Sequence, residues 1–269
     1  MFLRGLWVPV VYPALAIGLT FIGITVFRFF AEERQRLWTK RAFQHYVSRD
    51  VVDSLMANPG ALQFGGSVQN LTVLFSDIRD FTTYSERHEP QHVVSMLREH
   101  HTQLTQRVMD QRGTLDKYIG DAIMAIFGAP VALNDHAERA CRAALAMVAE
   151  NDVLHAKWVA QGEEPMHIGI GINSGPMVVG NLGSDQLFNY TVVGDNVNLG
   201  ARLESLNKEY KTSKGIIISE STYEAAKHAI DARAIGEVKV KGKMQPVAIY
   251  ELLGMKEAAA PAPRAAAPA

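Results

Sequence analysis

The chain has 269 residues, a formal net charge of −1 and one cysteine. That length suits one domain with appendages. The balanced charge argues against a nucleic-acid-binding protein, because such domains are usually strongly basic. The single cysteine, Cys141, excludes an intrachain disulfide, and its place among Ala and Leu residues indicates a small buried hydrophobic side chain rather than a catalytic thiol.

The first thirty residues differ in composition from the rest of the chain. No charged residue lies between Leu6 and Phe27, and Arg4 and Arg28 flank this run. As a helix rising about 1.5 Å per residue, the run is ~33 Å long, enough to cross a hydrocarbon core of ~30 Å. It therefore predicts one transmembrane segment within residues 1–28. A cleaved signal peptide is the alternative, although no cleavage site of small residues follows the run.

Positive charge is distributed unevenly around the apolar run. One arginine precedes it, whereas Arg28, Arg34, Arg36, Lys40 and Arg41 follow it. Because positively charged flanks favour the cytoplasmic side of a membrane, we expect a single-pass protein of the cell inner membrane whose C-terminal part is cytoplasmic.

Two further segments are expected to lie outside the main domain. Residues 29–66 predict a juxtamembrane helical linker, broken at Asn58-Pro59-Gly60. Its loose apolar stripe is compatible with a parallel two-stranded contact in a dimer, and equally with a helix that packs on its own domain. Residues 255–269 are rich in Ala and Pro and are expected to form a disordered tail.

The region between them, residues 67–254, mixes strand-like and helix-like patterns. The order of these patterns predicts an α+β fold with a ferredoxin-like β-α-β-β-α-β core and an α/β extension. In chain order, the expected elements are a strand at 71–77, a helix at 91–111, a hairpin of 117–119 and 122–127, a helix at 134–161, a hairpin of 167–173 and 177–180, a helix at 195–208, and short strands at 215–219, 238–240 and 247–252.

Two aspartates, Asp77 and Asp121, each end a strand-like apolar run and lie 44 residues apart. Turns at these points would hold both carboxylates at the rim of a sheet. Mg²⁺ prefers oxygen ligands and is commonly held by one or two carboxylates together with substrate phosphates. If the two aspartates share a site, they predict two-metal displacement at phosphorus. Either aspartate alone is more simply explained as a turn or capping residue.

The sequence around these aspartates resembles that of the class III adenylate/guanylate cyclases. The resemblance covers roughly residues 37–253, with its motifs in the family's order. It implies that the ribose 3′-hydroxyl of a nucleotide attacks its own α-phosphorus and that pyrophosphate leaves. It also implies two divalent cations, Mg²⁺ or Mn²⁺, held by Asp77, Asp121 and the carbonyl of Ile78. The motifs that carry it are FSDIRDFT, KYIGDAIMAIFGAP, GINSGPMVVGNLGS and NYTVVGDNVNLGARLESLNK.

The resemblance also implies which residues act on the sugar and the phosphates. The family pattern N-x-x-x-R matches Asn198, which would orient the ribose, and Arg202, which would stabilise charge on the transferring phosphate. Residues four apart share one face of a helix. ATP, two divalent ions and two carboxylates leave roughly two negative charges to be neutralised by Arg202 and a lysine. We expect Lys241 to contact phosphate, with Lys239 or Lys243 as alternatives.

Base recognition is implied by two further matches. Lys117 matches the family's adenine-contacting lysine, and its partner position falls at Thr191. A lysine can only donate hydrogen bonds, which suits the acceptor N1 of adenine and not the N1–H of guanine. Many adenylate cyclases have Asp at the partner position, whereas Thr occurs in a subgroup noted for bicarbonate sensitivity. We therefore expect ATP as substrate, with guanylate cyclase activity as the alternative.

The resemblance implies a homodimer with shared sites. One protomer would supply the aspartates, and the other would supply Lys117, Thr191, Asn198 and Arg202. Relatives with this arrangement carry a large extracytoplasmic sensor, so a sensor domain or a sensor subunit is an expected partner; nucleic acid is not. A catalytically silent regulatory dimerisation module and a diguanylate cyclase are the rival interpretations. The first predicts gaps among the functional residues, and the second needs an acidic hairpin that KYIGDAI does not supply.

The sequence departs from the residues usual in the family at two positions. Asp80 stands where Gly is common, and Gly200 stands where Ala is common. Asp80 is expected either to add charge near the metal site or to cap the following helix. Gly200 within a helix is expected to cost up to ~1 kcal/mol relative to Ala.

Overall fold

A computed structural model describes residues 2–3, 6–7, 11–43, 65–184, 186–238 and 246–256 of the chain. The chain divides into two compact units, Met1–Asp53 and Ser54–Ala269.

The N-terminal unit contains one long helix, α1, over Val11–Phe43. Two short antiparallel strands precede it, β1 (Phe2–Leu3) and β2 (Leu6–Trp7). Within α1, residues Val11–Phe30 have a mean hydropathy of 1.8 and are exposed, and they form the one described helix that is long and apolar enough to cross a membrane. The hydroxyls of Thr20 and Thr25 donate to backbone carbonyls one turn earlier, so both polar side chains are satisfied within the helix.

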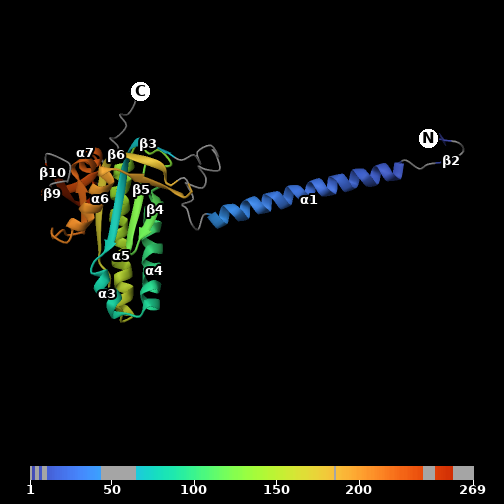
Figure 1. The fold of residues 1–269 in the computed structure, drawn as a ribbon. Coiled ribbons are helices and arrows are strands. Elements are labelled where there is room, and N and C mark those ends of the chain that lie inside the picture. The colour runs from blue at the N-terminus through green and yellow to red at the C-terminus, as the bar shows by residue number, and fades with distance from the viewer. Residues whose placement is uncertain are drawn as a thin grey trace, which may run out of the picture. The chain divides into compact units, whose positions relative to one another are not determined.

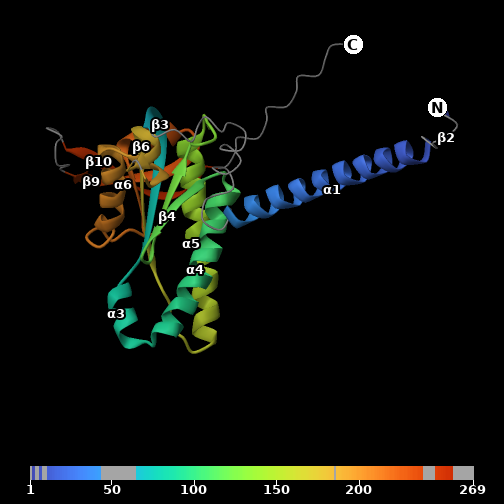
Figure 2. The ribbon, with the colours of Figure 1, turned by 45° about the vertical axis from the view of Figure 1, so that its right-hand side comes forward.

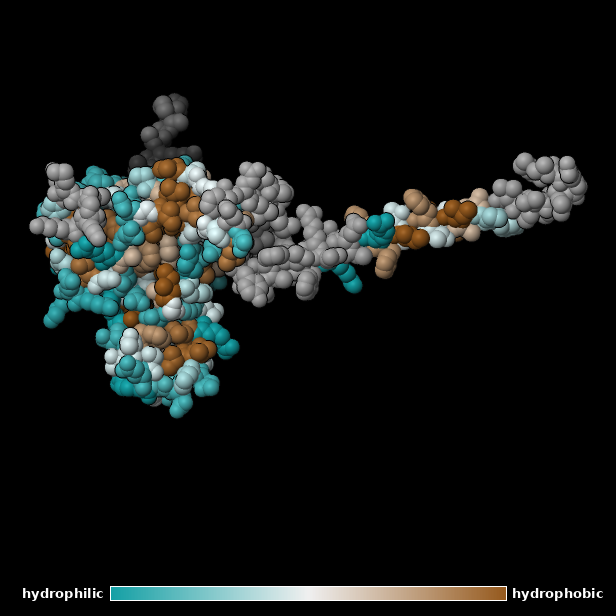
Figure 3. Space-filling view, viewed as in Figure 1, coloured by the Kyte–Doolittle hydropathy of each residue, from teal (hydrophilic) through white to brown (hydrophobic). Residues whose placement is uncertain are grey.

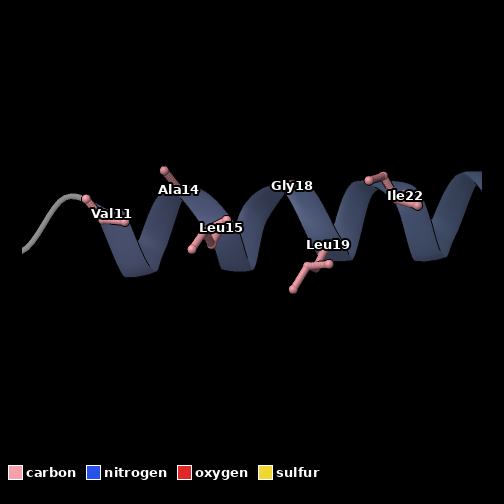
Figure 4. Close-up of a pocket in the computed structure, with 6 residues that line it drawn as sticks. All are labelled: Val11, Ala14, Leu15, Gly18, Leu19 and Ile22. Carbon is pink, nitrogen blue, oxygen red and sulfur yellow. The ribbon is translucent and has the colours of Figure 1, made fainter.

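One side of α1 carries a shallow apolar groove (Figure 4). Its lining lacks charged and hydrogen-bonding side chains, so it is not a candidate for chemistry. The groove is lined by Val11, Ala14, Leu15, Gly18, Leu19 and Ile22. Beyond the apolar stretch α1 continues to Phe43, which agrees with a helical start to the expected linker. Linker residues 44–64, including the predicted break at Asn58-Pro59-Gly60, lie outside the described residues, as does most of the expected tail. The last two linker residues, Gly65 and Gly66, begin the first strand of the C-terminal unit.

The C-terminal unit is built on one mixed sheet (Figure 1). Its strands lie in the order β4-β5-β3-β6-β8-β10-β9, and β7 pairs with β6 beside that path. All described pairs are antiparallel except β6 with β8. The strands are β3 (Gly65–Ile78), β4 (Thr114–Ile119), β5 (Ala122–Phe127), β6 (Ile168–Gly183), β7 (Phe188–Val193), β8 (Ile216–Ser219), β9 (Ile230–Val238) and β10 (Val247–Met255).

Helices cover both faces of this sheet. Alternate residues of β3 divide the core: Leu74 faces a cluster with α4 and α5, whereas Val73 and Phe75 face a cluster with α6. Helices α4 and α5 run alongside each other (Figure 2), and Cys141 is buried between α5 and the sheet as expected. The helices are α3 (Phe81–Arg87), α4 (Pro90–Asp110), α5 (His136–Ala160), α6 (Asp195–Leu206) and α7 (Glu220–Ala226).

The expected α+β class is confirmed, and the elements β3, α4, β4, β5, α5 and β6 follow the predicted β-α-β-β-α-β order. The predicted hairpin around Ser174-Gly175 is wrong. These residues lie inside the continuous strand β6, which pairs with β3 from Gly65 to Ile78. A Cβ atom at Gly175 would lie 2.7 Å from the side-chain nitrogen of Asn196. The glycine therefore allows a close approach inside a strand and does not mark a turn.

Candidate active site

The two predicted carboxylates meet at one end of β3. Asp77 is the penultimate residue of β3, and Asp121 lies in the turn that joins β4 to β5. Strands β3 and β5 pair up to Ser76 and Ile123, so both aspartates lie just beyond the last β3–β5 pair, while Asp77 is still paired with Gly169 of β6. The backbone N–H of Ile78 donates to Asp121 Oδ2 at 3.2 Å. Asp77, Ile78 and Asp121 therefore form one group, as predicted.

The turn that carries Asp121 depends on its neighbour. Gly120 has φ of 65°, in the left-handed region that glycine enters without steric cost. Helix α4 supports the same turn, because a ring nitrogen of His101 lies 3.2 Å from the backbone oxygen of Asp121. The His101 ring stacks on Tyr118 with centroids 4.3 Å apart, and the Tyr118 hydroxyl lies 2.9 Å from that of Thr105.

The electrostatics of the carboxylate pair fit a divalent cation. Burial raises the pKa of Asp121 to about 6, and the hydrogen bond and negative charge of Asp77 act in the same direction. Two close carboxylates resist ionising together, and a hard cation between them removes that repulsion. Among the residues that the structure describes, no group of three or more His, Cys, Asp and Glu side chains could hold a metal ion. The carboxylates that the structure brings together at this point are those of Asp77 and Asp121.

An ion pair between a half-buried arginine and a buried glutamate joins the end of β3 to α6. Arg79 Nη2 lies 2.8 Å from Glu204 Oε1 and also donates to the backbone oxygen of Glu204 at 3.2 Å. The guanidinium lies over Gly169, where a Cβ atom would collide with it. Burial raises the pKa of Glu204, while the charge of Arg79 opposes that rise. No pattern in the sequence identified this pair, whose members are 125 residues apart.

The predicted base-recognition residues also meet. Lys117 Nζ, on β4, donates to Thr191 Oγ1, on β7, at 3.0 Å. A third residue, Asp116, joins them: Thr191 Oγ1 donates to Asp116 Oδ2 at 2.6 Å, and Asp116 Oδ1 lies 3.1 Å from Lys117 Nζ. The Asp116 side chain is fully buried. No motif in the sequence pointed to Asp116.

The remaining predicted residues lie on α6 or outside the described residues. Asn198 and Arg202 are both exposed on α6, one turn apart. Lys241 and its alternatives Lys239 and Lys243 lie outside the described residues.

The two positions that depart from the family's usual residues have structural explanations. Asp80 has φ of 56°, and its side chain makes no capping hydrogen bond to α3. Its position therefore favours glycine for backbone reasons, and the predicted capping role is wrong. A Cβ atom at Gly200 would lie 2.8 Å from Val73 Cγ2, so α6 packs closely on β3 at this point.

Comparison with known proteins gives a consistent family match. Residues 65–254 match the model of the adenylate and guanylate cyclase catalytic domain. The chain is 37% identical to adenylate cyclase 1 of Rhizobium meliloti over 80% of its own length and 32% of the relative's, and 33% identical to an adenylate cyclase of Anabaena cylindrica over 80% and 43%. The chain thus spans less than half the length of these curated relatives.

Two crystal structures extend the match to the fold. The adenylyl cyclase CyaB from P. aeruginosa is 36% identical with a TM-score of 0.65, covering 72% of this chain and 98% of that one. The guanylyl cyclase Cya2 is also 36% identical, with a TM-score of 0.66, covering 72% and 96%. Similarity to cyclases named for either base leaves the choice of nucleotide to the residues of this chain.

Proposed function

The chain belongs to the adenylate and guanylate cyclase catalytic domain family, and on that premise we propose that it converts ATP to 3′,5′-cyclic AMP and pyrophosphate. The observation that carries the choice of ATP is the hydrogen bond from Lys117 to Thr191. It joins the two residues expected to recognise adenine, although they are 74 residues apart in the chain. The adenylate cyclases among the relatives support the same assignment.

Asp77 and Asp121 are proposed to hold two Mg²⁺ or Mn²⁺ ions together with the carbonyl of Ile78. When bound, such ions lower the pKa of an attacking hydroxyl and stabilise charge on phosphate. The raised pKa of Asp121 supports this role, because a carboxylate that resists ionising beside Asp77 gains most from an added cation. Asp77 and Asp121 would hold the cations at the end of β3.

The α6 residues are proposed to act on the sugar and the transferring phosphate. The bond from the ribose 3′-oxygen to the α-phosphorus forms, the bond from that phosphorus to the bridging oxygen of the leaving pyrophosphate breaks, and the hydroxyl proton passes to solvent water. Asn198 holds the ribose and Arg202 meets charge on the transferring phosphate, a role that can be worth ~10³ in rate. Lys241 is proposed to contact the triphosphate. The exposure of Asn198 and Arg202 supports these roles, since an exposed side chain can reach a bound substrate.

A homodimer with two shared sites is proposed to bring these groups together. Lys117 and Asp121 lie on one hairpin, and each would serve a different site across a two-fold axis. Apolar side chains are exposed on β4 and β7, the strands that carry Lys117 and Thr191. They include Tyr118, Ile119 and Val193. Figure 3 shows apolar residues in a band across one face of this unit. An exposed apolar surface of this kind is expected where two protomers associate.

The N-terminal helix is proposed to anchor the protein in the inner membrane by a single pass, with residues 67–254 in the cytoplasm. Residues 1–28 would form the membrane segment, 29–66 the linker and 255–269 the tail. The apolar stretch of α1 supports this arrangement. A sensor domain or subunit outside the membrane is proposed as the source of regulation.

Guanylate cyclase activity is the second candidate. The threonine hydroxyl at Thr191 can donate or accept, and the guanylyl cyclase Cya2 is as similar to this chain as CyaB is. A catalytically silent module is disfavoured, because every expected functional residue is present in the sequence.

Product analysis tests the proposal. The full chain in detergent or lipid nanodiscs is incubated with ATP or GTP and Mg²⁺ or Mn²⁺, and products are separated by chromatography. We expect cyclic AMP from ATP and none from Asp77→Asn. Cyclic GMP as the main product would assign the second candidate instead. No cyclic product under any condition would refute enzymatic activity.

A further inference from the structure

We propose that Asp116 determines the base selectivity of the site by holding the hydroxyl proton of Thr191, so that this hydroxyl presents a lone pair to the base. The proposal rests on the proposed nucleotide site and adds a residue to it. Asp116 does not touch the base in this account; it is a positioning residue that acts through Thr191.

A β-bulge places Asp116 in this role. In a regular strand, neighbouring side chains point to opposite faces, so Asp116 and Lys117 would not both reach one partner. The register of β4 against β5 shifts between Leu115 and Lys117, which pair with Ala125 and Met124, leaving Asp116 as the extra residue. Bulges re-aim side chains, and here both side chains contact Thr191.

The hydrogen bonds fix which way the hydroxyl points. A threonine hydroxyl has one proton and two lone pairs. The proton goes to Asp116 Oδ2 at 2.6 Å, because an ionised carboxylate can only accept. One lone pair accepts from Lys117 Nζ at 3.0 Å. A single lone pair remains, and Lys117 keeps N–H donors that are not bound to Thr191.

The donor that remains on Lys117 and the lone pair that remains on Thr191 match the hydrogen-bonding edge of adenine. Lys117 offers a donor to the ring nitrogen N1, which accepts, and Thr191 offers a lone pair to the 6-amino group, which donates. A 6-oxo purine in the same place would meet a donor with its N1–H and a lone pair with its O6. The preference for adenine therefore needs the Thr191 proton to be held away from the base, and Asp116 is the group that holds it.

The burial of Asp116 makes the arrangement sensitive to its charge. Its side chain is fully buried, and its Oδ1 atom has no hydrogen bond with good geometry, only the nearby Lys117 ammonium. In Asp116→Asn, the amide oxygen is expected to face Lys117, since a cation attracts an acceptor. The amide N–H₂ then faces Thr191, takes a lone pair and turns the hydroxyl proton toward the base.

Binding of two triphosphates that differ only in the 6-amino group tests the proposal. The 3′-deoxy forms of ATP and of purine riboside triphosphate lack the attacking hydroxyl and cannot cyclise. Their affinities for the full chain are measured by competition against a fluorescent ATP analogue. We expect the wild type to bind the amino form at least ~10-fold more tightly, because a site built to pair a polar group rejects the analogue that lacks it. Equal affinities, or a preference for the form without the amino group, would overturn the proposal without any variant.

Variants assign the effect to Asp116. We expect Asp116→Asn to reduce the ratio of the two affinities by at least ~10-fold, and the double variant with Thr191→Val to have the ratio of Thr191→Val alone, because residues that act through one another are not additive. Asp152→Asn, an exposed carboxylate on α5, is the matched control and should keep the wild-type ratio. An Asp116→Asn protein with the wild-type ratio would refute the role of Asp116. A wild type that binds ATP selectively but forms no cyclic product would refute the proposed function alone.

Discussion

Substituting Gly171 with alanine should displace α6 and so lower both the stability and the activity of the protein. Gly171 lies in β6 beneath the helix that carries Asn198 and Arg202. A Cβ atom at this position would lie 2.2 Å from the backbone nitrogen of Glu204 and 2.5 Å from the backbone oxygen of Gly200. Both atoms belong to the backbone of α6, so no side-chain rotation can relieve the contact.

The size of the effect follows from these distances. Ordinary contact begins at 3.4 Å, so α6 must retreat by about 1.2 Å from 2.2 Å. Overpacking costs roughly 1–3 kcal/mol, and a backbone clash puts Gly171→Ala near the upper end. For a domain of this size, ~3 kcal/mol corresponds to a fall in Tm of roughly 6–12 °C. A displacement of ~1 Å in a positioning element can also cost ~10²-fold in rate.

Thermal unfolding and cyclic nucleotide production of the full chain measure the two effects. Gly254→Ala on β10 is the matched control, since a Cβ atom there meets nothing within 4 Å. We expect this control to stay within about ±0.5 kcal/mol of the wild type and to keep its activity. If Gly171→Ala matched Gly254→Ala in both Tm and activity, the close packing of α6 on β6 would not position the α6 residues.

Three further changes have defined outcomes. Burial lowers the pKa of His100 to about 3, so its contribution to stability is complete above the unfolded pKa of ~6.5 and is lost as pH falls. Between pH 8 and pH 5, His100→Phe should therefore lose about 2 kcal/mol less stability than the wild type by denaturant titration. The exposed His167→Gln is the control and should follow the wild type. Arg79→Met should lower the free energy of unfolding by roughly 3 kcal/mol in the same assay, because it leaves Glu204 buried and unpaired. Adding Glu204→Leu should restore most of that stability. A double variant as unstable as Arg79→Met would argue against the ion pair as the cause. Arg202→Ala should lower kcat by ~10³ with little change in Tm, and unchanged kcat would remove Arg202 from the reaction.

Much of the fold followed from local patterns in the sequence. The helices α4, α5 and α6 and the β4–β5 hairpin were predicted because strong periodicity and turn residues marked them. The predicted hairpin within β6 failed because Ser174-Gly175 has the composition of a turn. Long-range pairing with β3, and a hydrogen bond of 2.7 Å between the hydroxyls of Thr72 and Ser174, hold that segment in a strand instead. Strand β9 was missed because much of it is exposed and polar.

The candidate site, like the fold, was predicted only in part. Asp77, Asp121, Lys117 and Thr191 were predicted from motifs, and the structure brings them together in two groups. The supporting contacts of Asp116 and His101 were not predicted. Asp116 bonds to a residue 75 positions away, through a bulge that no local pattern announces. Contacts of this kind depend on how strands twist and pair across the whole unit, which periodicity does not encode.

Mixing two inactive chains tests the central claim, a cyclase site shared between protomers, most directly. Asp77→Ala and Arg202→Ala chains are co-expressed in equal amounts, and cyclic AMP formed from ATP is measured. Half of the dimers should be mixed, and each mixed dimer should hold one intact site, so activity should recover to about a quarter of the wild type. Activity no higher than that of either variant alone would contradict the shared site.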